Sequence, residues 1–159
     1  MNPCPCGYRG SRLRACRCSP EQVARYQGRI SGPLLDRIDM QIEITPLAPD
    51  ALLQAAPGEP SASIRERVAA ARALALARQG VLNQQLQGQA LDEHSHADTA
   101  ALQLLQSAAT QLGWSARGIH RTLRLARSIA DLAASPSISS AHVAEAVQYR
   151  RALLGPARG

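Results

Sequence analysis

The chain has 159 residues, of which 45% are apolar, enough for one domain or two small ones with a packed core. Phe is absent and aromatic residues make up only 3%, so Leu, Ala, Ile and Val must fill the core, which favours helices over a β-sandwich. The formal net charge is +6 and every basic residue is Arg. The lack of Lys excludes a P-loop of the form G-x-x-x-x-G-K-[ST], in which a Lys reaches the phosphates. The sequence shows neither a signal peptide nor a run of about 18 apolar residues, so we expect a cytoplasmic protein with no membrane partner.

The N-terminal segment, residues 1–18, is rich in Cys, Arg, Gly and Pro. A helix is predicted directly after it, over residues 20–29. Ser19 and Gln22 have the spacing of a capping box, and Pro20 occupies the first helical position, where its missing N–H costs nothing.

The next elements are predicted to be short. Residues 34–37 are expected to form one turn of helix after a Ser-Gly-Pro break. Apolar and polar side chains alternate over residues 40–45, which predicts a half-buried strand, the only one in the chain. Four Pro and one Gly then mark residues 46–60 as a linker.

An Ala- and Arg-rich helix is predicted to follow this linker. Ser63 and Glu66 have the spacing of a second capping box, so we expect the helix to begin at Ser63 and to end near Gln79. Residues 80–97 are polar and rich in Gln, with little periodicity, and they are predicted to be a loop.

Three further helices are predicted after residue 98, over residues 98–112, 115–134 and 139–153. Each begins with a capping Asp or Ser, and Gly113 ends the first of them. The second presents one apolar face through Ile119, Leu123, Ala126 and Ala130. The third is expected to bury Val143, Ala146 and Val147. Short connections between the three predict a small helical bundle.

Four cysteines form a C-x-C…C-x-C pattern at Cys4, Cys6, Cys16 and Cys18. Thiolates are soft donors, and four of them complete the tetrahedral shell of a structural zinc ion. Four reduced thiols or two disulfides are the alternatives, and disulfides are disfavoured in a cytosolic protein. We interpret the cluster as a zinc knuckle and leave free thiols as the competing interpretation.

Two other groups of polar residues have weaker interpretations. His94 and His96 could also bind a metal, but an isolated H-x-H lacks further ligands at a recognised spacing, which favours simple solvation. Arginines crowd the Cys segment and could contact DNA phosphates or could form a solvated rim around the knuckle, and both hypotheses stay open. They are Arg9, Arg12, Arg14 and Arg17.

Several motifs occur together in a fixed order. Asn2-Pro3-Cys4-Pro5-Cys6-Gly7-Tyr8 comes first, then Ser31-Gly32-Pro33-Leu34-Leu35-Asp36-Arg37-Ile38-Asp39, then Ser115-Ala116-Arg117 with Ala126-Arg127-Ser128-Ile129-Ala130-Asp131-Leu132. Together they resemble the magnesium-chelatase-like AAA+ ATPases, in particular the competence-protein (ComM) branch. The resemblance covers nearly the whole chain and begins at the position of sensor 1.

The resemblance implies roles for three residues. Asn2 matches sensor 1, whose amide positions the attacking water or touches the γ-phosphate. Arg37 matches the arginine finger, which neutralises charge on the transferred phosphoryl group of a neighbouring subunit. Arg117 matches sensor 2 at the start of a lid helix. As alternatives, Arg37 could pair with an adjacent Asp, and Arg117 could lie with Arg121, Arg124 and Arg127 on the solvated face of its helix.

The resemblance also implies a fold and a division of the chain. We expect a mainly α protein, in which the C-terminal remnant of an AAA+ large subdomain, with one strand and the Cys knuckle, precedes a helical lid bundle. The expected segments are 1–60 for the core end, 61–97 for a connecting helix and loop, and 98–159 for the lid. Walker A, Walker B and the pore hairpins are absent, so we expect a fragment, a truncated gene or a misassigned start, inactive as an ATPase alone.

The resemblance implies that the chain is the C-terminal part of an ATPase that forms a hexameric ring of identical subunits. This ATPase would act on single-stranded or branched DNA, as a helicase for branch migration in natural transformation. ATP and Mg²⁺ would bind only in the full-length protein. One alternative is a fragment of a magnesium-chelatase ATPase subunit, against which the Cys knuckle argues. The other is a zinc-containing nucleic-acid-binding module with no enzymatic role, supported by the cysteines and the basic charge.

Overall fold

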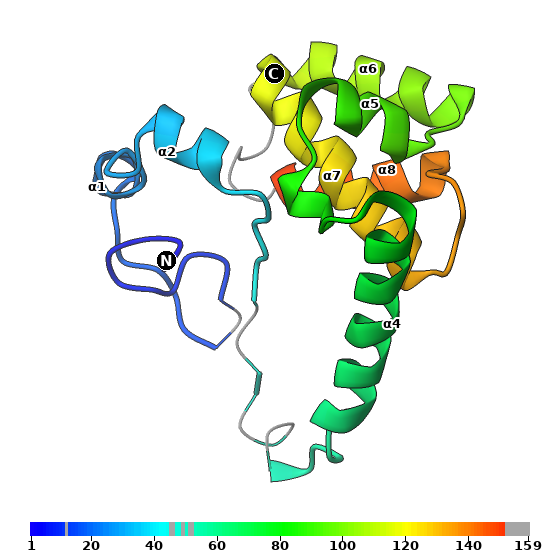
Figure 1. Cartoon of the computed structure of the whole chain (residues 1–159). Coiled ribbons are helices and arrows are strands. Elements are labelled where there is room, and N and C mark those ends of the chain that lie inside the picture. The colour runs from blue at the N-terminus through cyan, green and yellow to red at the C-terminus, as the bar shows by residue number, and fades with distance from the viewer. Residues whose placement is uncertain (12, 45–46, 49, 51–52, 152–159) are drawn as a thin grey trace. The chain divides into compact units, whose positions relative to one another are not determined.

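The computed structural model describes residues 1–11, 13–44, 47–48, 50 and 53–151, and it gives no side-chain description for residue 151. The chain divides into two compact units (Figure 1). The first comprises Met1–Ile38 and Glu43–Gly58, and the second comprises Asp39–Ile42 and Glu59–Gly159. The three segments expected from the sequence, divided near residues 60 and 97, stay a prediction.

Two helices, α1 and α2, follow the Cys-rich segment in the first unit. Helix α1 spans Pro20–Gln27, and Ser19 and Gln22 make both hydrogen bonds of the predicted capping box. Helix α2 spans Gly32–Arg37, slightly longer than the single turn expected. Val23 is the buried residue of α1, and α2 buries none, so helix–helix packing contributes little to this unit.

The predicted strand over residues 40–45 is wrong for its described part, because residues 40–44 have no regular secondary structure and no strand partner within the part of the chain that the structure describes. Thr45 lies outside the described residues. Ile42 and Ile44 are 66% and 87% exposed. Instead of joining a ladder, the Gln41 N–H donates to the Tyr149 carbonyl at 2.7 Å. An alternating pattern specifies which face of a strand is buried, but a strand also needs a neighbour to accept its hydrogen bonds.

The second unit begins with a long helix and then departs from the expected loop. Helix α4 spans Ser61–Gln79, begins two residues before the predicted capping box at Ser63, and has Pro60 as its N-cap with no side-chain hydrogen bond. Residues 80–97 are not a loop. They form a 3₁₀ turn, η1, over Asn83–Gln85 and helix α5 over Gly88–Ser95. Leu86 and Leu91 are buried in the core, and these two anchors order a segment with little periodicity.

The three C-terminal helices agree with the sequence. Helix α6 spans Thr99–Leu112, helix α7 spans Ala116–Leu132, and helix α8 is described over Ser140–Arg151. Asp98 and Ser115 cap α6 and α7 as predicted, and Gly113 ends α6 with φ at 62°. The predicted end of the last helix, at residue 153, lies outside the described residues.

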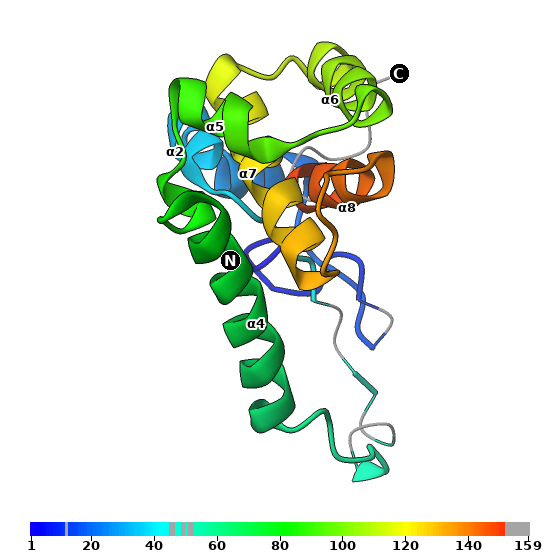
Figure 2. The same cartoon turned by 45° about the vertical axis from the view of Figure 1, so that its right-hand side comes forward.

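Helix α7 is the centre of this bundle, since it contacts α4, α5, α6 and α8 (Figure 2). The core contains Leu123, Ala126 and Ala130 of α7 and Val143 and Ala146 of α8, which confirms the predicted apolar faces. The chain is therefore mainly helical with a C-terminal lid-type bundle. In both views the C-terminal turns of α4 lie against the bundle, and its N-terminal turns extend away from it. Among the described residues, no helix is both long and apolar enough to cross a lipid bilayer.

Arg127 is fully buried, so the interpretation of Arg121, Arg124 and Arg127 as a solvated face is wrong for this residue. Its guanidinium donates to the carbonyls of Ser95, Ser135 and Pro136 at 3.2, 2.6 and 3.1 Å. Arg124 also turns inward, donating to the Leu86 carbonyl at 2.9 Å. Position 127 lies one turn after Leu123, within the apolar stripe, and its charge is tolerated because the guanidinium is hydrogen-bonded.

Asp131 is the counter-charge of Arg127. Its carboxylate lies 3.0 Å from the Arg127 guanidinium and also accepts from Arg78 at 2.7 and 3.0 Å and from the Asn83 amide at 2.8 Å. Burial raises the pKa of Asp131, but these donors outweigh burial and lower its pKa overall. One carboxylate thus joins α7 to α4 and η1.

We predict that Asp131→Ala lowers the free energy of unfolding of the chain by about 3 kcal/mol or more, because it leaves Arg127 buried without its counter-charge. Urea denaturation followed by circular dichroism measures this loss. Glu59→Ala, which removes the exposed partner of Arg67, is the matched control and should cost less than about 1 kcal/mol. Equal losses for the two variants would contradict a structural role for the buried carboxylate.

Candidate functional site

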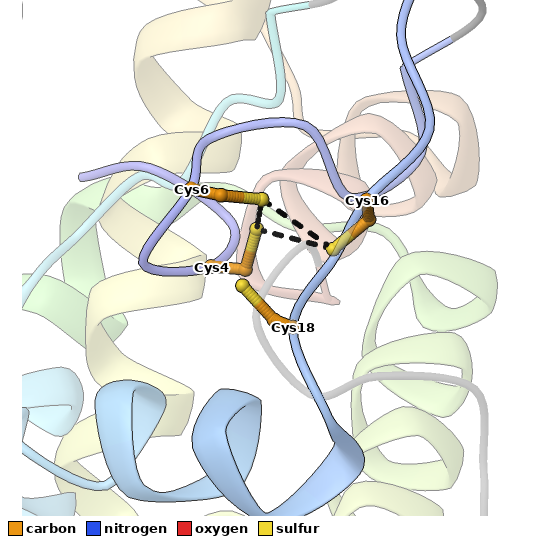
Figure 3. A group of neighbouring side chains, drawn as sticks. All are labelled: Cys4, Cys6, Cys16 and Cys18. Atoms are coloured by element: carbon orange, nitrogen blue, oxygen red, sulfur yellow. Dashed lines mark hydrogen bonds between the residues drawn. The ribbon is translucent and has the colours of Figure 1, made fainter.

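The four cysteines meet in one small cluster, formed by two chain segments that approach each other (Figure 3). The first segment turns sharply at Gly7, whose φ of 81° suits glycine and whose N–H donates to the Cys4 carbonyl at 3.0 Å. This turn places Cys4 and Cys6 on one side, facing Cys16 and Cys18 of the second segment. The sequence pattern therefore identified residues that lie together in space.

The sulfur atoms have the spacing of metal ligands. The Sγ atoms of Cys4, Cys6 and Cys16 are 3.4 to 3.6 Å apart, and all four lie within 4.8 Å of one another. None of the four is disulfide-bonded, and Cys4 is completely buried. In a tetrahedral site with metal–sulfur bonds of about 2.3 Å, sulfur atoms stand about 3.8 Å apart. The cluster could hold a metal ion after shifts of a few tenths of an ångström among these three sulfur atoms and of at most about 1 Å for that of Cys18.

The backbone around the cluster favours thiolates at some positions. Hydrogen bonds from the backbone N–H groups of Tyr8 and Arg17 lower the pKa of Cys6 to about 6. The Cys6 N–H acts in the same direction on Cys18, but burial and the other three thiols raise the pKa of Cys18 to about 12. Four thiolates crowded together repel one another, so a bound cation is what would allow all of them to ionise.

The basic residues of this segment lie at its surface. Arg9, Arg14 and Arg17 are exposed, while Arg12 lies outside the described residues. The Arg14 guanidinium is 4.8 Å from the centre of the Tyr8 ring and donates to the Tyr8 hydroxyl at 3.4 Å. These contacts hold one arginine against the knuckle and leave the choice between DNA contact and a solvated rim open.

The three residues with implied ATPase roles lie in different places. Asn2 is exposed beside the knuckle, with its amide nitrogen 3.7 Å from the position that a Cβ would take at Gly7. Arg37 is exposed in the last turn of α2. Arg117 is exposed in the first turn of α7, where backbone N–H groups and the helix dipole favour an anion. Their roles as sensor 1, finger and sensor 2 stay predictions.

The two histidines lie at the end of α5, with His96 as its C-cap. Neither belongs to a group of three or more possible metal ligands; among the described residues, the four cysteines are the one such group. His94 is half-buried and His96 is exposed with φ at 48°. The His96 carbonyl accepts from the Ile138 N–H at 3.0 Å, so its backbone helps to join α5 to the segment before α8.

Sequence reasoning missed the buried polar network of Arg78, Asn83, Arg127 and Asp131. Arg127 and Asp131 are four residues apart on α7, a spacing at which opposite charges meet on one helix face, so the pair had a recognisable signal. Arg78 and Asn83 had none, because the chain between them was expected to be a loop. An open groove of about 280 Å³ adjoins this network, lined by Val68, Ala75, Leu82, Asn83, Asp131 and Leu132 among others.

Comparison with known proteins finds a matching family for each of two parts of the chain, residues 1–52 and residues 58–150. The family described as magnesium chelatase, subunit ChlI C-terminal, matches residues 58–150, and the family described as magnesium chelatase, subunit ChlI, matches residues 1–52. The chain is 43% identical over 155 residues to the uncharacterized protein YifB of Salmonella typhimurium and 40% identical over 153 residues to the competence protein ComM of Haemophilus influenzae. Each match covers 94% of this chain and 29% of the relative, so the chain spans less than a third of these proteins. On this evidence, the chain belongs to the magnesium chelatase ChlI family.

Proposed function

We propose that this chain is the C-terminal part of a ring-forming AAA+ ATPase and supplies its arginine finger and its lid with sensor 2. The ATPase acts on DNA, as a ComM-like helicase for branched or single-stranded DNA. One observation carries the proposal: the chain belongs to the ChlI family along almost its whole length and is 40% identical to the competence protein ComM of Haemophilus influenzae over 153 residues. In this proposal ATP and Mg²⁺ bind in the full-length protein, within a ring of identical subunits, six by analogy with AAA+ rings.

The exposed positions of two arginines support this role. Arg37 ends a short helix at the surface, from which a guanidinium can reach the nucleotide of a neighbouring subunit and neutralise the charge of the transferred phosphoryl group. Arg117 sits at a helix N-terminus of the kind that binds phosphate. In the proposal, Asn2 supplies the amide that orients the attacking water.

The cysteine cluster supports a structural zinc site within the same protein. Three of the four free thiols lie at nearly the sulfur–sulfur spacing of a tetrahedral site, the fourth lies within 4.8 Å of them, and backbone N–H groups of Tyr8 and Arg17 hydrogen-bond to Cys6. Zinc bound there would link the two chain segments of the knuckle, a constraint that this unit needs because its helices bury few apolar residues. The cluster also favours the ComM branch over a magnesium-chelatase subunit.

We predict that the chain, purified without chelators, contains about one zinc ion per molecule and that the double variant Cys16→Ser, Cys18→Ser contains almost none. Elemental analysis by mass spectrometry measures the content. The matched control is His94→Ala with His96→Ala, which should keep the metal because these residues lie outside the cluster. Metal-free wild-type protein, or loss of zinc from the histidine variant, would refute this assignment.

We predict that Arg37→Ala reduces ATP turnover roughly 10³-fold or more while ATP binding persists, since an arginine finger acts on the transition state. The measurement uses a full-length ATPase in which this chain replaces the matching 29% of Haemophilus influenzae ComM. Arg25→Ala, an exposed arginine in the last turn of α1, is the matched control and should retain turnover.

A mixing experiment separates a finger from a merely structural arginine. Subunits with Arg37→Ala have an intact nucleotide site, and subunits with a disabled P-loop have an intact finger. Mixed rings should recover part of the turnover, because the two intact parts meet at some interfaces. The assignment is refuted if Arg37→Ala keeps normal turnover or if mixing restores none.

A further inference from the structure

The segment Asp39–Ile42 is attached to the lid bundle, although the chain on both sides of it belongs to the other unit. Two contacts make this attachment. The Arg121 guanidinium on α7 pairs with the Asp39 carboxylate at 2.5 Å, and the Gln41 N–H donates to the Tyr149 carbonyl on α8 at 2.7 Å. The segment that failed to form a strand is thus held by two different helices of the bundle.

The two residues of the ion pair lie close in sequence to the two arginines of the proposed ATPase site. Asp39 follows Arg37 by two residues, so their Cα atoms are at most about 7 Å apart, whatever the placement of the two units. Arg121 follows Arg117 by four residues on α7, which places it about 6 Å further along the helix axis. The ion pair therefore joins the chain just after the finger to the helix that begins with the sensor 2 candidate.

The attachment is stronger than its surface ion pair alone. The Asp39 side chain is 60% exposed, and a pair of this kind contributes little stability by itself. The Arg121 side chain is only 20% exposed, which restricts its conformations, and the hydrogen bond from Gln41 is independent of the charges. A shift of α7 relative to this segment would have to break the ion pair or carry the segment with it.

We propose that Asp39 and Arg121 are positioning residues that couple the arginine-finger segment to the sensor 2 helix within one subunit. This inference rests on the proposed function, in which Arg37 and Arg117 both act where neighbouring subunits meet at ATP and hydrolysis needs both in place. Nucleotide-dependent movement of α7 is then transmitted through Arg121 to Asp39 and from there to Arg37. The pair thereby keeps the finger segment and the sensor 2 helix of one subunit in register while ATP is hydrolysed.

The attachment itself is tested on the 159-residue chain. Amide hydrogen exchange, read by NMR, should show protection at Gln41, and Asp39→Asn should reduce that protection several-fold while the amides of α7 keep theirs. Unprotected Gln41 in the wild-type chain would overturn the inference, because the segment would not be held to the bundle.

The coupling is tested in the full-length ATPase chimera. Asp39→Asn and Arg121→Gln should each lower turnover roughly tenfold with little change in ATP affinity, because a displaced finger costs rate and not binding. The exchanged pair, Asp39→Arg with Arg121→Asp, should recover most of the loss. Arg67→Gln is the matched control, since it breaks another surface ion pair, with Glu59, and should leave turnover unchanged.

The outcomes distinguish the inference from the function on which it rests. If Arg37→Ala abolishes turnover while both single charge variants keep it, the inference alone is overturned. Failure of the exchanged pair to restore turnover also overturns it, because the charges would then not act on each other. If Arg37→Ala keeps normal turnover, the proposed function fails and the inference falls with it.

Discussion

The lid bundle depends on the buried carboxylate of Asp131. Two guanidinium groups and one amide converge on it, from Arg78, Arg127 and Asn83, so it fixes α4 and η1 against α7. Arg127 extends the connection to the backbone at Ser95 and at the turn before α8. A charge buried in this way is stable only while every partner stays in place, so the network favours a single arrangement of the helices.

Different contacts hold the two ends of α7. The C-terminal half of the helix carries Arg127 and Asp131 and is anchored to α4 and α5, while its first turn carries the exposed Arg117. Gly118, in the same turn, lies against Trp114 and the Arg150 guanidinium, where a Cβ would be 3.3 Å from Trp114. Arg150 in turn is 5.6 Å from the centre of the Trp114 ring. Arg117 is therefore presented by a helix whose two ends are both held.

The sequence predicted those parts of the fold that depend on local chemistry. Capping by Ser19, Asp98 and Ser115 needs only a side-chain oxygen and a free N–H two or three residues later, so these helix starts were recognisable. Ser63 has the same local pattern, but the helix begins at Ser61 because Pro60 itself has the extended backbone of an N-cap. The cysteine cluster was likewise predictable, since a close turn brings its members together.

Features that depend on a partner far away in the chain were not predictable in this way. Whether Gln41 joins a strand or the Tyr149 carbonyl is decided by which acceptor is nearby, more than 100 residues later. Arginine is a residue type usually found at the surface, and the burial of Arg127 is possible because Asp131 and three backbone carbonyls bind its guanidinium. Sequence patterns give the propensity of a segment, whereas these positions are determined by hydrogen bonds that tertiary packing supplies.

The basic charge around the knuckle could be taken as a sign of DNA binding. Residues 1–30 contain six Arg and one Glu, a strongly basic balance. With zinc bound as proposed, four thiolates and the ion would carry a formal charge of −2, which would attract nearby guanidinium groups. The proposed metal site would then account for part of the basic charge, and Arg14 is in addition held on Tyr8. Basic composition alone consequently does not argue for nucleic acid at the knuckle, and the proposal of a DNA-acting protein rests on the family and on the similarity to ComM.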